Sequence, residues 1–216
     1  MPMRSIKLVL SALMLGSSGA MLVACQPAQA PDTAARTGPV TSREDVVPLV
    51  RPLSLTAMDE PLIVEFELLP PGPNSNTTLT LGLRVFGADD LASAAVARTV
   101  TESSLQAKLK LSRLEAGNEV PIPLARREYR GYDAPEIVQV DADGQVPRVV
   151  LTSIDTTAME RAGIPIGAPS SRVLAFAWAS DATPGSYRLE LKLIAPAPEL
   201  ESIRSELLLA YQHKSK

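Results

Sequence analysis

The chain has 216 residues, of which 45% are hydrophobic, 21% are charged and 4% are aromatic, and its formal charge at pH 7 is −3. A single cysteine excludes an internal disulfide and a cysteine-based zinc cluster, and a single histidine excludes a site built from several histidines. No basic excess indicates a nucleic acid, so we expect no nucleic-acid partner.

Residues 1–24 have the layout of a secretory signal peptide. Arg4 and Lys7 precede an uncharged stretch, residues 8–24, which ends in small and aliphatic side chains. A basic start, an apolar middle and a small residue before the cleavage point are typical of such signals. Glycine and serine interrupt the stretch at residues 16–19, which makes it marginal as a spanning helix. An uncleaved membrane anchor is the alternative.

The signal ends in Leu22, Val23, Ala24 and Cys25, which resemble the lipobox of bacterial lipoproteins. The small Ala24 suits a peptidase pocket, and the Cys25 thiol is the nucleophile that accepts a diacylglycerol. We therefore predict that Cys25 is lipidated and that the lipid bilayer is one partner of the chain; a buried free cysteine is the alternative. Gln26 follows the cysteine in place of an aspartate. By resemblance to Gram-negative sorting rules, this implies the periplasmic face of the outer membrane in a Gram-negative host.

Residues 25–55 are predicted to form a flexible tether behind the lipidated cysteine. Five prolines fall between residues 26 and 52, and the first half is rich in alanine, threonine and glutamine. Such a composition buries too little apolar surface to offset the entropy of ordering. Within this stretch, the aliphatic residues at 46–50 are predicted to dock as an edge strand, since the neighbouring prolines exclude a central position.

Residues 56–216 are predicted to form one β-sandwich domain. Apolar residues alternate with glutamates over residues 64–68, and with polar residues over residues 79–85. The Pro-rich break at residues 70–74 separates the two strands. We expect these strands to pair with each other and to bury one face.

The middle of the domain is predicted to contain a helix and further strands. Asp89 and Asp90 are suited to cap a helix over residues 91–100. Residues 105–111 alternate leucine and alanine with lysine and glutamine, which favours a strand and leaves a helix as the alternative. Residues 125–147 are predicted to be a long loop with a minor strand at residues 137–140.

The last third of the sequence contains the patterns that predict the remaining strands. A turn at residues 141–144 leads to a strand over residues 146–154, and an apolar run at residues 173–179 indicates a central strand covered on both sides. Residues 187–193 alternate regularly, residues 196–203 suggest one helical turn, and residues 206–211 form the final strand. The fold class that follows is all-β: an antiparallel β-sandwich with one or two short helices.

No group of residues in the domain indicates catalysis. The Asp-Ala-Asp-Gly sequence at 141–144 resembles the start of a calcium loop, but no later acid follows within the loop, so a hairpin turn is favoured. The acids at 89–90 are interpreted as a helix cap, and the glutamates at 65 and 67 as a solvated strand face. His213 is interpreted as a solvated tail residue. We therefore expect no catalytic residue, metal or cofactor, and no enzyme.

One basic and aromatic cluster is the candidate contact surface. It falls in the predicted loop after residue 125, and functional residues often lie on long loops of a rigid scaffold. Its members are Arg126, Arg127, Tyr129, Arg130 and Tyr132. A plain exposed loop is the alternative.

The domain is similar to a family of small bacterial lipoproteins that carries a C-terminal β-sandwich domain of unknown function. The resemblance lies in residues 81–86, 120–124, 198–203 and 210–211, and above all in residues 184–191, which begin Pro-Gly-Ser-Tyr-Arg. It implies a strand that leads through a short Pro-Glu-Leu turn to the last strand. Some members of the family are associated with immunity to antibacterial toxins, which implies a protein partner.

These observations together predict a membrane-anchored, non-enzymatic binding module. The partner is expected to be a protein, and the resemblance implies an immunity or inhibitor role against a secreted toxin. The alternative is a structural or assembly lipoprotein of the cell envelope.

Overall fold

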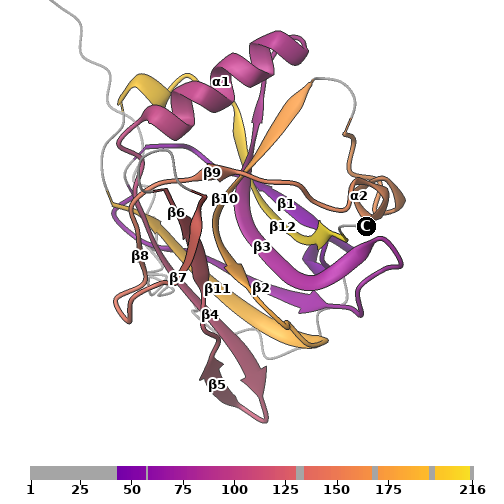
Figure 1. Ribbon diagram of the computed structural model, residues 1–216. Coiled ribbons are helices and arrows are strands. Elements are labelled where there is room, and N and C mark those ends of the chain that lie inside the picture. Colours follow the sequence, from indigo (N-terminus) through magenta and orange to yellow (C-terminus); the bar gives the residue numbers. More distant parts are fainter. Residues whose placement is uncertain (1–42, 57, 130–133, 167–169, 195–197, 215–216) are drawn as a thin grey trace, which may run out of the picture. The chain divides into compact units, whose positions relative to one another are not determined.

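The alternating strands fold as an antiparallel β-sandwich (Figure 1). The computed structural model describes residues 43–56, 58–129, 134–166, 170–194 and 198–214, all of which belong to one compact unit, residues 39–216. The predicted signal peptide, the lipobox residues Leu22, Val23 and Ala24, and the predicted lipidation site Cys25 lie outside the described residues. The fold class predicted from the sequence is confirmed.

Two sheets face each other. In order, the five-stranded sheet contains β2 (Leu62–Leu68), β11 (Gly185–Leu193), β4 (Ala107–Glu115) and β5 (Asn118–Pro121), with β8 (Gln145–Val146) on β4. The seven-stranded sheet contains, in order, β1 (Leu49–Pro52), β12 (Ser205–His213), β3 (Ser75–Phe86), β10 (Ser171–Ala179), β6 (Ala125–Glu128) and β7 (Glu136–Gln139), with β9 (Val150–Leu151) on β10. The helical elements are η1 (Arg43–Asp45), α1 (Asp90–Glu102), α2 (Thr156–Arg161) and η2 (Pro198–Leu200).

The main core lies between the sheets and is built by the predicted alternation. Along β11, Tyr187, Leu189, Leu191 and Leu193 are buried, and the intervening residues are partly exposed. Tyr187 stacks on its register partner Phe66 of β2 with ring centroids 5.6 Å apart, which joins two neighbouring strands on the core side of the five-stranded sheet. The strand predicted at residues 105–111 is β4, and the rival helix is wrong.

The predicted pairing of the first two long strands is wrong. β2 pairs with β11, whereas β3 pairs with β12 and β10 in the other sheet. The connection at residues 70–74 therefore carries the chain from one sheet to the other. β3 is also buried on both faces, because Thr80 and Arg84 are covered as fully as the leucines between them. Alternation gives the face of each residue but not the strand beside it.

A second layer covers the outer side of the seven-stranded sheet. Met159 of α2 and Ile154 pack on Leu208 and Ala210 of β12. Val173 of β10 packs against this layer, and Ala175 and Trp178 pack with Val150 of β9. The apolar run at residues 173–179 is therefore a central strand, as predicted, with almost every side chain buried.

The same layer encloses an ion pair. Arg84 is 4% exposed, and its guanidinium donates to the Glu206 carboxylate at 2.6 Å and to the Pro165 carbonyl at 2.6 Å. Its guanidinium also lies 4.8 Å from the centre of the Phe86 ring. The charge is buried but fully partnered, which is the condition under which such a group is tolerated.

The helices form where the sequence places their caps. The Asp89 carboxylate accepts a hydrogen bond from the Ala92 N–H at 2.8 Å at the start of α1. Asp155 caps α2 in the same way, through the Ala158 N–H, and is 1% exposed. Its second carboxylate oxygen accepts from the Ser75 hydroxyl at 2.6 Å, so the buried charge is held by two elements.

The sandwich includes residues that the sequence assigns to the tether. Leu49, Leu53 and Leu55 are buried, so the fold begins before residue 56. The edge strand predicted at residues 46–50 corresponds to β1, which pairs with β12 at the end of the seven-stranded sheet. Because this region is rich in proline, its composition alone does not indicate that its apolar residues are buried.

Two further predictions in the middle of the chain are wrong in part. The minor strand predicted at residues 137–140 is confirmed as β7, but the segment predicted as a loop, residues 125–147, also contains β6, which pairs with β7 in a hairpin. This hairpin is exposed over much of its length and so lacks an apolar alternation. The strand predicted at residues 146–154 is interrupted at Pro147, and its two short pieces, β8 and β9, join different sheets.

Candidate functional site

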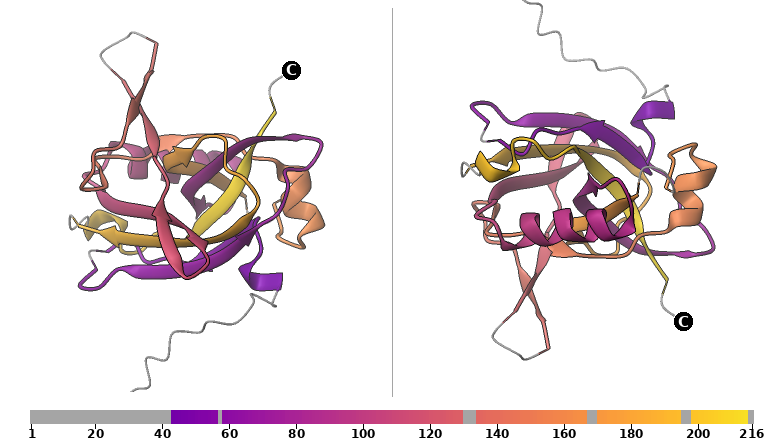
Figure 2. Two further views of the ribbon diagram at one scale, coloured as in Figure 1. Left: turned by 90° about the horizontal axis from the view of Figure 1, so that it is seen from below. Right: turned by 90° about the horizontal axis from the view of Figure 1, so that it is seen from above.

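The β6–β7 hairpin is the end of the seven-stranded sheet, and both views of Figure 2 show it standing out from the rest of the sandwich. β6 is held to the body at its base, where Ala125 pairs with Trp178 of β10. The antiparallel register then aligns Arg127 with Ile137. The candidate contact residues Arg126, Arg127 and Tyr129 therefore lie on or beside a hairpin and not on an irregular loop. The other two candidates, Arg130 and Tyr132, lie outside the described residues.

The two arginines of β6 point to opposite sides of the hairpin, because successive side chains of a strand alternate. Arg127 lies over the indole of Trp178, with the guanidinium carbon 5.2 Å from the ring centre. Arg126 turns to the other side and lies 3.6 Å from the Glu128 carboxylate. The sequence places the arginines side by side, but the structure gives them different surroundings.

Trp178 forms the floor of this surface. Its side chain packs with Val150 and Ala175 and is 5% exposed. Its Nε1 has no hydrogen-bond partner among the described residues, and neither has the hydroxyl of Thr80, which is its register partner on β3. A cation above an indole ring is a favourable contact of about 0.5–2 kcal/mol, depending on its exposure to water.

Apolar side chains stand exposed beside this contact. Ile137 is 74% exposed and shares the face of its register partner Arg127, while Tyr129, which follows β6, is 44% exposed. We call Arg127, Tyr129, Ile137 and Trp178 the hairpin patch. Aromatic residues and arginine are the types that carry most binding energy in protein interfaces. Ile137 and Trp178 carry no signal in the sequence that connects them to the arginine, since only the strand register brings them to it.

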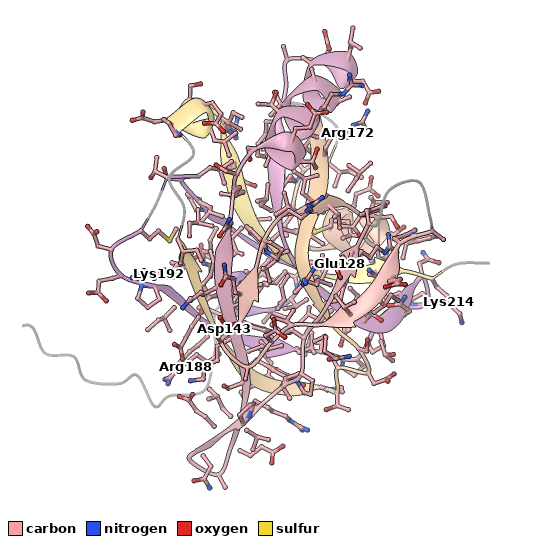
Figure 3. The ribbon with its side chains drawn as sticks, turned by 60° about the vertical axis from the view of Figure 1, so that its left-hand side comes forward. Glu128, Asp143, Arg172, Arg188, Lys192 and Lys214 are labelled. Carbon is pink, nitrogen blue, oxygen red and sulfur yellow. The ribbon has the colours of Figure 1, made fainter. Side chains whose placement is uncertain are left out.

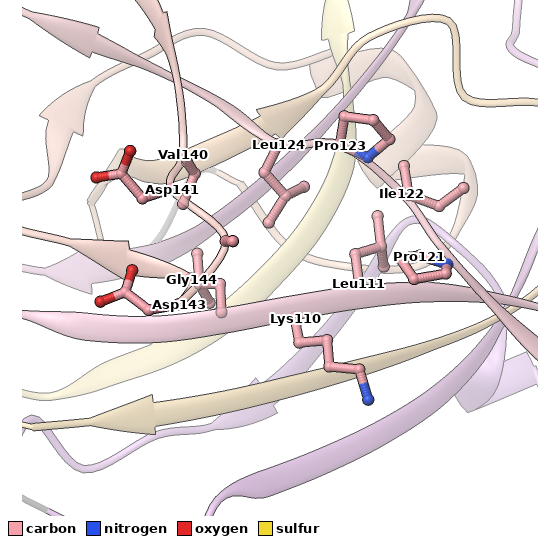
Figure 4. A pocket seen from close by; sticks show the side chains of 12 residues that line it. Lys110, Leu111, Pro121, Ile122, Pro123, Leu124, Val140, Asp141, Asp143 and Gly144 are labelled. Atoms are coloured by element: carbon pink, nitrogen blue, oxygen red, sulfur yellow. The ribbon is translucent and has the colours of Figure 1, made fainter.

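A cleft opens between β4 and the two segments that connect the hairpin to β5 and β8 of the five-stranded sheet. It has a volume of about 310 Å³ and lies between β4, residues 121–124 and residues 140–144. Leu111, Ile122 and Leu124 point toward one another across it, whereas the Lys110 amine and the Asp141 and Asp143 carboxylates turn outward (Figure 4). The cleft therefore offers an apolar wall and no converging polar groups.

The predicted turn at residues 141–144 borders this cleft. The Gly144 N–H donates to the Asp141 carbonyl at 2.8 Å, and the Asp143 carboxylate accepts from the Gln145 N–H at 3.0 Å. Gly144 has φ +75°, a conformation that favours glycine. The turn predicted here is confirmed, but it is not a hairpin turn, because it links β7 of the seven-stranded sheet to β8 of the five-stranded sheet. Across the described ranges, no three histidine, cysteine or acidic residues are grouped as metal ligands would be.

The acids considered for catalysis are engaged in structural contacts. Asp89 caps α1, and Asp90 forms an ion pair with Arg172 at 2.8 Å. Glu65 pairs with Arg188, and Glu67 accepts from the Ser186 hydroxyl at 2.8 Å. His213 is exposed at the end of β12.

Glu65 belongs to a set of charges on the outer side of the five-stranded sheet. Arg188 contacts both Glu65 and Glu119, and Lys110 lies 2.9 Å from Glu190 and 3.5 Å from Glu119. We call these five residues the charged ladder; Arg188 and Lys192 stand on this side of β11 (Figure 3). Hydrogen bonding to Glu190 raises the pKa of Lys110, and hydrogen bonding to Glu65 raises the pKa of Arg188. The strand face on which Glu65 lies is predicted to be solvated. Its acidic and basic side chains contact one another.

No known family matches the chain, and no curated protein matches it. Among solved structures, it is similar to the crystal structure of GEBA250068378 from Sulfurospirillum deleyianum, with 11% sequence identity and a TM-score of 0.40. The similarity covers 78% of this chain and 98% of that chain. A similarity of this size says nothing about what the chain does. Within the described residues, no helix has the length and apolar character needed to cross a membrane.

Proposed function

We propose that the chain is a lipid-anchored envelope protein whose β-sandwich is a non-enzymatic binding module for a protein partner. The observation that carries the binding role is the hairpin patch. It combines an exposed isoleucine and tyrosine with an arginine stacked on a tryptophan, on a hairpin that stands out from the sandwich. Burying such apolar and aromatic groups against a partner is favourable.

The anchor is proposed from the sequence. Cys25 is the only cysteine of the chain and follows Leu22, Val23 and Ala24 after an apolar stretch. Two or three acyl chains hold a protein on a membrane where one chain holds it weakly. In a Gram-negative host, the proposed location is the periplasmic face of the outer membrane.

The anchor is tested by Cys25→Ser in the native host. We expect this variant to lose acylation, measured by incorporation of a labelled fatty acid, and to leave the membrane fraction or accumulate unprocessed. Normal processing together with membrane fractionation of the variant would contradict the lipoprotein assignment.

The binding role is tested by photocrosslinking in living cells. A crosslinking amino acid at position 129 is expected to give one defined adduct with a protein. Ile137→Asp should abolish the adduct, because a charge then occupies the centre of the hairpin patch. Leu91→Asp is the matched control, since Leu91 is 82% exposed on α1 and its replacement should leave the adduct intact.

The partner's identity decides between the two roles. An adduct with a secreted toxin of a rival cell would support immunity, and an adduct with an envelope assembly component would support the structural alternative. No adduct from position 129, or equal loss of the adduct in both aspartate variants, would refute binding at the hairpin patch.

A further inference from the structure

We propose that the partner supplies an extended segment that adds to the sandwich as a new strand alongside β7. This inference rests on the proposed binding role and specifies how the partner is held. β7 is the last strand of the seven-stranded sheet and pairs with β6 alone among the described strands. An edge strand presents a row of backbone hydrogen-bonding groups to any extended chain that approaches it.

The register identifies which backbone groups point outward. The Val140 N–H donates to the Leu124 carbonyl at 2.8 Å, toward the β6 side of the hairpin. Backbone groups alternate between the two edges of an antiparallel strand, so those of Val138 and Glu136 also face β6. The N–H and C=O groups of Ile137 and Gln139 then face the free edge. They offer two donors and two acceptors over about 7 Å of strand.

Two other edges are blocked at the equivalent positions. On β1, the Leu53 N–H bonds to Ser205, so Pro48 and Pro52 occupy positions that face away from β12. On β5, the Ile122 N–H bonds to Leu111, so Pro121 faces away from β4. Proline has no N–H to donate, and it blocks strand addition where it faces outward.

The remaining long edge, β2, is partly covered. The Val47 N–H donates to the Glu67 carbonyl at 3.0 Å, which occupies one end of that edge. By the same alternation, the backbone groups of Ile63 and Glu65 face outward farther along β2, and among the described residues this part of the edge is open. β7 differs from β2 because its edge is on the projecting hairpin, where an approaching chain meets no second layer (Figure 2).

The side chains beside this edge define the segment that fits. Ile137 is 74% exposed on the same face as Arg127, so the added strand should place an apolar residue opposite Ile137. Pro135 precedes β7 at the next outward-facing position and ends the open edge there. The predicted ligand is therefore a short extended segment with a central apolar residue, bound mainly through its backbone.

The probe is a displayed library of random 12-residue peptides, selected on the full chain in detergent. The wild-type chain should enrich peptides that share a central apolar residue, and binding should protect the Ile137 and Gln139 amides from hydrogen exchange. Ile137→Pro removes one outward N–H together with the isoleucine side chain, whereas Ile137→Ala removes the side chain and keeps the N–H. We expect Ile137→Pro to weaken binding of a selected peptide about tenfold or more beyond Ile137→Ala. Ile63→Pro is the matched control on β2 and should leave the affinity unchanged.

A proline at an outward-facing edge position is compatible with a folded strand, which an unchanged near-ultraviolet circular dichroism spectrum would verify. Gln139→Pro is the second variant if Ile137→Pro fails to fold. The proposal would be overturned if no peptide were enriched, or if a selected peptide bound Ile137→Pro as tightly as it binds the wild type or Ile137→Ala. It would also be overturned if only Ile63→Pro lost binding of the peptide. Dimerisation of the wild type by light scattering, abolished by Ile137→Pro, would assign the edge to a second copy and would also overturn it.

The crosslinking experiment separates this inference from the proposed function. If the adduct from position 129 persists in Ile137→Pro, the partner binds the hairpin patch without adding a strand. If the adduct is absent in the wild type as well, the binding role itself fails.

Discussion

Tyr211 offers a quantitative test of how the core holds a polar group. Its side chain is 6% exposed, and its hydroxyl donates a hydrogen bond to the Leu69 carbonyl at 2.8 Å. Burial, with a smaller electrostatic contribution from Tyr187, raises the pKa of Tyr211 from 10.0 to about 12. The change Tyr211→Phe removes the hydroxyl, its hydrogen bond and its titration together.

The pKa shift fixes the sign of the pH dependence. The folded-state pKa lies above the unfolded value, so the neutral phenol is favoured in the native state. The stability of the wild type is therefore fully present below about pH 10 and falls as the pH rises toward about 12. At about pH 8, the wild type should exceed Tyr211→Phe by about 1 kcal/mol, the net value of one hydrogen bond. By about pH 11, linkage removes on the order of 1 kcal/mol from the wild type alone, so the difference in stability between the two proteins should shrink toward zero.

The assay is urea unfolding of both proteins at about pH 8 and about pH 11. Val85→Ala is the control, because Val85 is fully buried and carries no titratable group. Its free energy of unfolding should lie below that of the wild type by the same amount at both pH values. If the difference in free energy of unfolding between the wild type and Tyr211→Phe is also the same at both pH values, the reasoning is refuted.

Three further predictions concern the architecture. Glu206→Ala leaves the Arg84 charge buried without its carboxylate and should destabilise the fold by about 3–5 kcal/mol in urea unfolding; a loss below about 1 kcal/mol would contradict this. Gly144→Ala would place a Cβ 2.2 Å from the Leu109 carbonyl at a positive φ, so we expect a large drop in Tm, and an unchanged Tm would count against the turn geometry. Limited proteolysis should remove residues before Arg43 and leave a resistant core, and mass spectrometry that finds a core beginning before about residue 35 would contradict the tether.

The sequence predicts the elements that obey a single local rule. Residues 187–193 and residues 64–68 alternate strictly because one face of each strand is buried, and the structure confirms both strands. Asp89 lies directly before a run of helix-forming alanines, and it caps α1 as expected. In these cases the information lies within one element, so neighbouring residues are sufficient to read it.

The features that depend on contacts distant in sequence are not predictable in this way. β2 and β3 are adjacent along the chain but lie in different sheets, which their alternation does not indicate. The same limit applies to the candidate site. The arginines at 126 and 127 are visible in the sequence, but Trp178, about 50 residues later, lies under Arg127 only because β6 pairs with β10.

The two exposed surfaces of the sandwich differ in what a partner would have to displace. On the charged ladder, each acid and base already contacts an opposite charge, so a partner that docked there would have to remove water from paired ions without gaining new pairs. On the hairpin patch, covering Ile137 and the ring of Tyr129 removes apolar surface from water, which is favourable. The arginine there is already stacked on Trp178, which lowers the entropy cost of fixing it in an interface. This asymmetry is why binding at the hairpin patch is the stronger expectation, although the ladder carries more charge.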